Sequence, residues 1–303
     1  MELPRQIAPM LAQSALEPFD SPDFLFEIKW DGTRCLALYD GERLQLQNRR
    51  DFEMQDRYPE LACLTGLPAG TVLDGEIIVL DAGRPSFNKL ARREQTREPR
   101  QIADLSRRLP ATLVAFDLLF DAGKSTMAMP LRDRRERLQR VVKSLASPHV
   151  IAADYVVERG TRYFEAAEQH QLEGIMAKRL DSPYLPGKRS PHWLKIKVAQ
   201  TGEFEILGYV QREKEPVVSA LIVGEKAGSR WVFKAKVGSG FNESMRSEWF
   251  SLLCDAPLLK NPPKDGPREA VWRTPGLRCY VRFFEKTPTG KLRAPVFKGL
   301  VPR

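Results

Sequence analysis

The segment FEIKWDGTR (26–34) places a lysine, an aspartate, a glycine and an arginine where one alternating stretch ends and the next begins. A lysine amine is a potential nucleophile, and a glycine beside it lets the backbone approach a phosphate closely. Carboxylates, an aromatic residue and paired lysines recur farther along, in LDGE (73–76), FDLL (116–119), LEGIMAKR (172–179) and WLKIK (193–197). Any one segment could be a hairpin with solvated charges, but the ordered series predicts a site for chemistry on phosphates.

Alternating hydrophobic residues predict the strands that carry these segments. RCLALYDGERLQLQNR reads as two strands joined at Asp40-Gly41, a dipeptide suited to a tight turn. Residues 71–81 and 111–121 read as two further strands, each ending at an acid. After Pro130, an apolar stripe over 131–146 predicts a helix. We expect the five arginines of that helix to lie on a solvated face.

The pattern changes near residue 200. Short strand-like segments recur in 201–303 with one helix-like stretch, NESMRSEWFSLL. Several short strands with one helix predict a small all-β barrel of the oligonucleotide-binding (OB) type. We therefore place a domain boundary between 1–200 and 201–303.

The charge distribution favours a polyanionic partner. The chain has 48 Lys+Arg against 39 Asp+Glu, and residues 201–303 hold 18 basic and 11 acidic residues, most of the excess. The four cysteines are far apart and form no CxxC pair, which argues against zinc and a disulfide framework. No apolar run approaches the ~18 residues of a membrane span, and the N-terminus lacks a secretory pattern. We expect a cytoplasmic protein without membrane contact.

The series resembles the motifs of the ATP-dependent DNA ligases, which are lysine-adenylylating nucleotidyltransferases. K-x-D-G-x-R, D-G-E, F-D-L, E-G-x-x-x-K and W-x-K-x-K occur in that family's order between residues 29 and 197. The tail TPTGKLRAPVFKGL is similar to the family's last motif, so the resemblance covers nearly the whole chain. The chain resembles the bacterial ligases of the non-homologous end-joining type, either the ligase domain of ligase D or its short stand-alone relatives. The resemblance implies an α+β fold, with a nucleotidyltransferase (adenylylation) domain of antiparallel sheets and flanking helices before the OB barrel.

The resemblance implies that Lys29 attacks the α-phosphate of ATP and releases pyrophosphate. AMP then passes to a 5′-phosphate at a nick, and the 3′-hydroxyl displaces it. An ordinary lysine has a pKa of ~10.4, so the amine must be made neutral. We expect Arg34, Lys195, Lys197 and a divalent metal to crowd Lys29 and lower its pKa.

The family's motifs also imply contacts to the nucleoside. Glu27 would accept a hydrogen bond from the adenine amino group, and Phe116 would stack on the adenine face. Glu76 would hold the ribose hydroxyl. Arg34 and Arg49 would contact ribose and phosphate, although Arg50 follows Arg49 directly and the register could shift by one.

The remaining motifs imply contacts to metal and phosphates. Glu173, together with Glu76, would bind Mg²⁺ or Mn²⁺, which carboxylates suit. Lys195 and Lys197 are two apart on a predicted strand, so both face one triphosphate. Arg189 would be a further ATP contact.

The C-terminal tail departs from the family pattern. The family's last motif closes with an Asp-Lys pair that orients pyrophosphate, whereas this sequence has Arg293 and Lys298 and reads GLVPR at its end. We expect Arg293 and Lys298 to serve the first step, and Arg303 is an alternative.

The expected partner is nicked or broken double-stranded DNA, bound by a monomer at the bacterial nucleoid, with a Ku-like end-binding protein as a further candidate. Competing interpretations are an RNA ligase, a capping-type guanylyltransferase, and an inactive DNA-binding relative.

Overall fold

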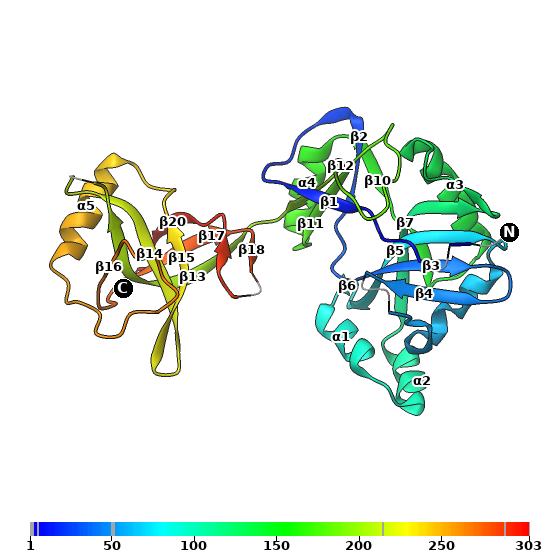
Figure 1. The fold of residues 1–303 in the computed structure, drawn as a ribbon, viewed down its shortest axis with the longest axis horizontal. Coiled ribbons are helices and arrows are strands. Elements are labelled where there is room, and N and C mark those ends of the chain that lie inside the picture. Colours follow the sequence, from blue (N-terminus) through cyan, green and yellow to red (C-terminus); the bar gives the residue numbers. More distant parts are fainter. Residues whose placement is uncertain (1–2, 5, 50–51, 214, 288, 303) are drawn as a thin grey trace. The chain divides into compact units, whose positions relative to one another are not determined.

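The alternating stretch around Asp40-Gly41 forms a hairpin of β3 (Thr33–Tyr39) and β4 (Leu44–Asn48), which pair antiparallel. Gly41 has a φ of +112°, a conformation that a residue without a Cβ adopts at little cost. The computed structural model describes residues 3–4, 6–49, 52–213, 215–287 and 289–302. The chain divides into two compact units, Met1–Val198 and Ala199–Arg303 (Figure 1).

In the first unit, a seven-stranded sheet has the order β4-β3-β5-β7-β8, with β6 paired to β5 and β9 to β7. Its further strands are β5 (Thr71–Asp81), β6 (Arg84–Pro85), β7 (Ala111–Asp121), β8 (Lys124–Ser125) and β9 (Val150–Ala152). The 3₁₀ segments and helices that accompany it are η1 (Gln55–Arg57), η2 (Pro59–Gly66), α1 (Phe87–Gln95), α2 (Pro99–Arg108) and α3 (Leu131–Ser144). Leucines of η2, α1 and α3 pack on one face of this sheet and form the main core of the unit.

A five-stranded sheet in the same unit has the order β1-β12-β11-β2-β10. Its members are β1 (Leu11–Ala15), β2 (Ser21–Ile28), β10 (Tyr155–Glu158), β11 (Gly174–Arg179) and β12 (Arg189–Lys197), and α4 (Gly160–Gln169) packs against β11 and β2. Most pairs are antiparallel, but β1 runs parallel to β12 and β9 parallel to β7. A second buried cluster, which includes Leu36, Val114 and Trp193, joins the two sheets.

Two arginines of α3 correct the expectation of a solvated face. Arg134 and Arg135 have no exposed surface. Arg134 binds Asp117 through two nitrogens, at 2.7 and 2.8 Å, while Arg135 donates to the carbonyl of Phe116 at 2.6 Å. Burial is possible because these acceptors meet the guanidinium groups inside the protein. The prediction was wrong because the apolar stripe of a helix says nothing about carboxylates and carbonyls that other strands bring to it.

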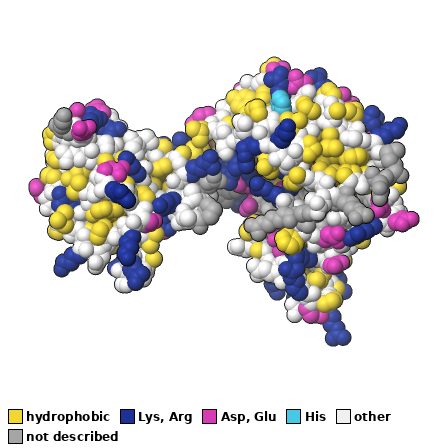
Figure 2. Space-filling view, viewed as in Figure 1, with side chains coloured by type: hydrophobic (Ala, Val, Ile, Leu, Met, Phe, Trp, Pro, Cys, Tyr) yellow, Lys and Arg dark blue, Asp and Glu magenta, His cyan; other side chains and the backbone are white. Residues whose placement is uncertain are grey.

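The second unit contains a six-stranded sheet of order β15-β14-β13-β17-β20, with β16 paired to β13, and the small β18–β19 pair. Its elements are β13 (Gln200–Gln211), β14 (Val218–Ala227), β15 (Arg230–Val237), α5 (Glu243–Cys254), β16 (Ala270–Trp272), β17 (Arg278–Phe283), β18 (Glu285–Lys286), β19 (Leu292–Arg293) and β20 (Val296–Leu300). Lys and Arg side chains are spread over the face of this unit seen in Figure 2, among hydrophobic and a few acidic ones. The described parts of the chain contain no helix long and apolar enough to cross a membrane.

Candidate active site

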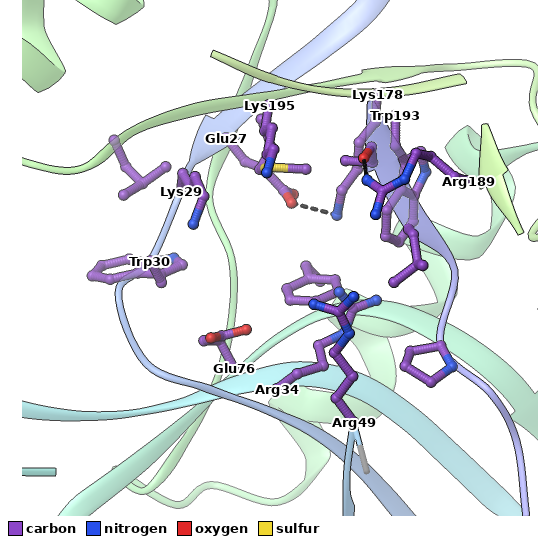
Figure 3. Close-up of a pocket in the computed structure, with 16 residues that line it drawn as sticks. Glu27, Lys29, Trp30, Arg34, Arg49, Glu76, Lys178, Arg189, Trp193 and Lys195 are labelled. Atoms are coloured by element: carbon purple, nitrogen blue, oxygen red, sulfur yellow. Dashed lines mark hydrogen bonds and ion pairs between the residues drawn. The ribbon is translucent and has the colours of Figure 1, made fainter. Parts of the chain in front are cut away.

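A cavity of about 240 Å³ lies between the two sheets of the first unit. Strands β2, β11 and β12 line it from one sheet, and β3, β5 and β7 line it from the other. In Figure 3, Lys29 and Trp30 lie on one side, and Arg189 and Trp193 lie opposite. The predicted residues that line the cavity are Glu27, Lys29, Arg34, Arg49, Glu76, Phe116, Arg189 and Lys195.

Lys29 follows the last residue of β2, and its backbone N–H donates to the carbonyl of Gly174 at 3.0 Å. Its Nζ atom lies 2.5 Å from Oε2 of Glu173, and Nζ of Lys197 lies 2.8 Å from Oε1 of the same carboxylate. The predicted nucleophile is therefore held by a carboxylate that a second lysine shares. Glu173 and Lys197 are thus brought to Lys29 without lining the cavity themselves.

Two glycines of the motifs are required by close backbone packing. A Cβ on Gly32 would lie 2.2 Å from the carbonyl oxygen of Ile77, and one on Gly174 would lie 2.1 Å from that of Ile196. Gly174 also has a φ of +145°. A larger residue at either position would push apart the strands that position Lys29 and Glu173.

Arg34 lines the cavity but is bound by Asp74, a residue that sequence reasoning did not single out. The Arg34 Nε atom lies 2.5 Å from Oδ1 and Nη2 lies 2.6 Å from Oδ2 of this fully buried carboxylate. The hydroxyl of Tyr184 donates to Asp74 at 2.7 Å. Asp74 is the aspartate of the D-G-E motif, so the motif itself was the sequence signal that could have identified this residue. Arg34 is therefore held by a carboxylate of β5, and its expected influence on Lys29 stays a prediction.

At one end of the cavity, which we call the aromatic end, lie Glu27, Phe116, Lys178 and Trp193. Nζ of Lys178 forms an ion pair with Glu27 and lies 4.0 Å from the centre of the Phe116 ring and 4.2 Å from that of Trp193. Burial lowers the pKa of Lys178, and the Glu27 carboxylate opposes this shift. Sequence reasoning missed Lys178, although Lys178 is the last residue of the E-G-x-x-x-K motif. Its side chain lies on the same face of β11 as that of Met176, and both residues line the cavity.

The carboxylates near Lys29 form the candidate metal site. Burial raises the pKa of Glu76 to about 7, partly offset by Arg34 and Lys29. Burial and the charge of Glu173 also raise the pKa of Asp31. The described residues contain no group of three or more His, Cys, Asp or Glu that could enclose a metal. Because Mg²⁺ is commonly held by one or two carboxylates together with substrate phosphates and water, Glu173 and Glu76 suit such an ion.

The remaining predicted residues fall in different places. Arg49 is exposed at the cavity, and Arg189 donates to the backbone carbonyl of Ala12. The alternative Arg50 lies outside the described residues. Arg293 and Lys298 are exposed on the second unit, so their part in the first step stays a prediction.

Comparison with protein families decides the identity of the chain. Residues 9–197 match the ATP dependent DNA ligase domain, and residues 214–302 match the ATP dependent DNA ligase C terminal region. The chain belongs to the ATP-dependent DNA ligases. The resemblance and the α+β fold class predicted from the sequence are thereby confirmed.

Two curated ligase relatives differ in length. The chain is 31% identical to the multifunctional non-homologous end joining protein LigD of Mycolicibacterium smegmatis, over 99% of this chain and 39% of that protein. It therefore spans about two fifths of that relative. It is 30% identical to the SPbeta prophage-derived DNA ligase-like protein LigB of Bacillus subtilis, over 97% of this chain and 98% of that protein.

Solved ligase structures agree with this placement. The ligase domain of LigD from M. tuberculosis superposes with a TM-score of 0.60 at 30% identity, covering 98% of this chain and 96% of that one. A mycobacterial DNA ligase D complexed with ATP and MES superposes with a TM-score of 0.56 at 29% identity, covering 98% and 96%.

Proposed function

We propose that the chain is a DNA ligase that uses ATP to join 5′-phosphate and 3′-hydroxyl ends of duplex DNA in repair. The observation that carries the proposal is the position of Lys29, at a strand end beside a cavity that also holds Glu27, Glu76 and Phe116. Family membership supports the same activity.

In the first step, Nζ of Lys29 attacks the α-phosphorus of ATP. A nitrogen–phosphorus bond forms, the bond to pyrophosphate breaks, and the amine transfers a proton to water. Lys195 lines the cavity and Lys197 lies beside Glu173, and both would neutralise charge on the phosphates. Charge neutralisation and positioning provide most of the catalysis in phosphoryl transfer. Glu27 would accept from the adenine amino group, and Phe116 would stack on the base once the Lys178 ammonium shifts from its ring.

The second step transfers AMP to the DNA. A 5′-phosphate oxygen attacks the AMP phosphorus and the bond to Lys29 breaks. In the third step the 3′-hydroxyl attacks the 5′-phosphorus, the phosphodiester forms and AMP leaves. Arg49, exposed at the cavity, would hold the 5′-phosphate.

Glu173 and Glu76 would hold Mg²⁺ or Mn²⁺, which would supply charge neutralisation to the bound phosphates. Displacing the Glu173 carboxylate toward a cation would free the amine of Lys29 from its ion pair.

The basic second unit would grip the DNA backbone without reading sequence. The chain would act as a monomer in the bacterial cytoplasm, at the nucleoid. A Ku-like end-binding protein is a candidate partner, because a relative carries non-homologous end joining in its name.

The test is incubation with ATP labelled at the α-phosphate, followed by nicked DNA or nicked RNA. We expect labelled protein, then labelled DNA, then a sealed strand. An adduct formed from GTP would indicate a capping-type enzyme, and sealing of RNA alone would indicate an RNA ligase. Absence of any adduct would indicate an inactive relative and overturn the proposal.

A further inference from the structure

Arg135 joins three segments of the chain behind the aromatic end of the cavity. Its Nη1 atom donates to the carbonyl of Phe116 on β7 at 2.6 Å, and Nη2 donates to the carbonyl of Ala153. Nη1 also lies 3.5 Å from Oε2 of Glu27 on β2. One fully buried guanidinium therefore fixes the backbone of the candidate stacking residue relative to the candidate base acceptor.

The Glu27 carboxylate has acceptor capacity that the protein does not use. Oε1 pairs with Lys178, whereas Oε2 is buried and accepts no hydrogen bond from the described residues. Leaving a buried acceptor without a donor costs free energy, and an ionised carboxylate offers about four acceptor positions. Because Glu27 lines the cavity, its carboxylate can accept a hydrogen bond from a donor on a bound molecule in addition to its ion pairs with Lys178 and Arg135.

We propose that Arg135 is a positioning residue for base selection. It fixes the position of the Glu27 carboxylate relative to the Phe116 backbone, so that the cavity favours a purine with an amino group at C6. A carbonyl oxygen at C6 would set acceptor against acceptor and would be rejected. This inference rests on the proposed function, since it concerns the nucleotide of the adenylylation step.

The neighbouring residue offers a matched control. Arg134 lies on the same helix and is equally buried. It binds Asp117 and the carbonyls of Met129 and Ser182, at 2.6 and 2.9 Å, and none of these three residues lines the cavity.

The test compares R135K and R134K in the full chain. Equilibrium dissociation constants are measured by calorimetry for ATP and for purine riboside triphosphate, which lacks the amino group. Both variants keep a positive charge, and thermal melting tests whether each of them folds. Removing one hydrogen bond to a charged group is worth about tenfold. R135K should therefore bind ATP about tenfold more weakly and purine riboside triphosphate less than about twofold more weakly.

Arg134→Lys should change both dissociation constants by the same factor. Glu27→Gln should lose the preference for ATP over purine riboside triphosphate, as R135K does. Retention of the full ATP preference by R135K would overturn the inference, as would an equal loss in R134K. Absence of a protein–AMP adduct in the unsubstituted chain would overturn the proposed function instead. The binding ratio is read independently of that adduct, so the two failures are distinguishable.

Discussion

Lys29 and Glu173 are 144 residues apart in the chain, yet the Lys29 Nζ atom lies 2.5 Å from Oε2 of Glu173. The other oxygen of this carboxylate is 2.8 Å from Nζ of Lys197. The residue that we propose as a metal ligand thus also holds the proposed nucleophile. Movement of the Glu173 carboxylate toward a bound metal would free the amine of Lys29 from this ion pair.

Substitution of Lys29 tests the nucleophile. Lys29→Ala should abolish the protein–AMP adduct and sealing, because Lys29 is the lysine of the K-x-D-G-x-R motif that follows β2 at the cavity. Sealing of a nick that already carries 5′-AMP should persist in part, since the third step forms no bond to lysine. Gel detection of labelled protein measures this. Lys188→Ala, which removes an exposed lysine, should keep the adduct, and an adduct that survives in Lys29→Ala would assign the nucleophile elsewhere.

Substitution of Glu173 tests the metal site. Glu173→Ala should slow adduct formation roughly 10- to 100-fold, as loss of groups that support metal sites does. Removal of divalent metal with EDTA should bring the unsubstituted protein to a similarly low rate. Glu168→Ala, an exposed glutamate on α4, is the control. A Glu173→Ala rate equal to that of the control would remove Glu173 from the mechanism.

Phe116 is 7% exposed and could be either a base platform or a core residue. Phe116→Ala should raise the KM for ATP by the equivalent of about 1–3 kcal/mol of lost stacking, while Phe116→Tyr should have a mild effect. Steady-state kinetics and thermal melting of both variants separate the two roles. Loss of folding without a specific change in KM would support the core role.

The raised pKa of Glu76 predicts a pH-dependent stability. The unfolded chain ionises this residue near 4.5 and the folded chain near 7, so the folded state binds more protons between these values. The contribution of Glu76 to the free energy of unfolding should therefore fall as pH rises from 4.5 to 7, by up to about 3 kcal/mol. The free energy of unfolding of Glu76→Gln, relative to that of the unsubstituted protein, should therefore be higher at pH 8 than at pH 5. Urea unfolding at both values measures this, and a pH-independent difference would contradict it.

Neutralising Arg293 and Lys298 together tests the tail. The double alanine variant should form adduct slowly while still sealing a nick that carries 5′-AMP. Lys260→Ala with Lys264→Ala removes the same charge from exposed positions of the same unit and should leave adduct formation unchanged. Normal adduct formation with failed DNA binding would make the tail a DNA contact.

Local patterns in the sequence determined the strands and the position of the proposed nucleophile. Residues 71–81 and 111–121 form β5 and β7 over those ranges, and helix α3 begins at the predicted Leu131. Lys29 stands out because its neighbours in the chain, Asp31 and Gly32, complete the motif. Such features depend on residues close together in sequence, where alternation and helical periodicity operate.

The tertiary structure decided which charges meet. Pairs such as Lys29–Glu173, Arg34–Asp74 and Glu27–Lys178 join strands far apart in the chain. The sequence does not distinguish a solvated charged residue from one that is buried against a partner, because only packing brings that partner within reach. For this reason Arg135, which local reasoning left in solvent, lies fully buried behind the cavity.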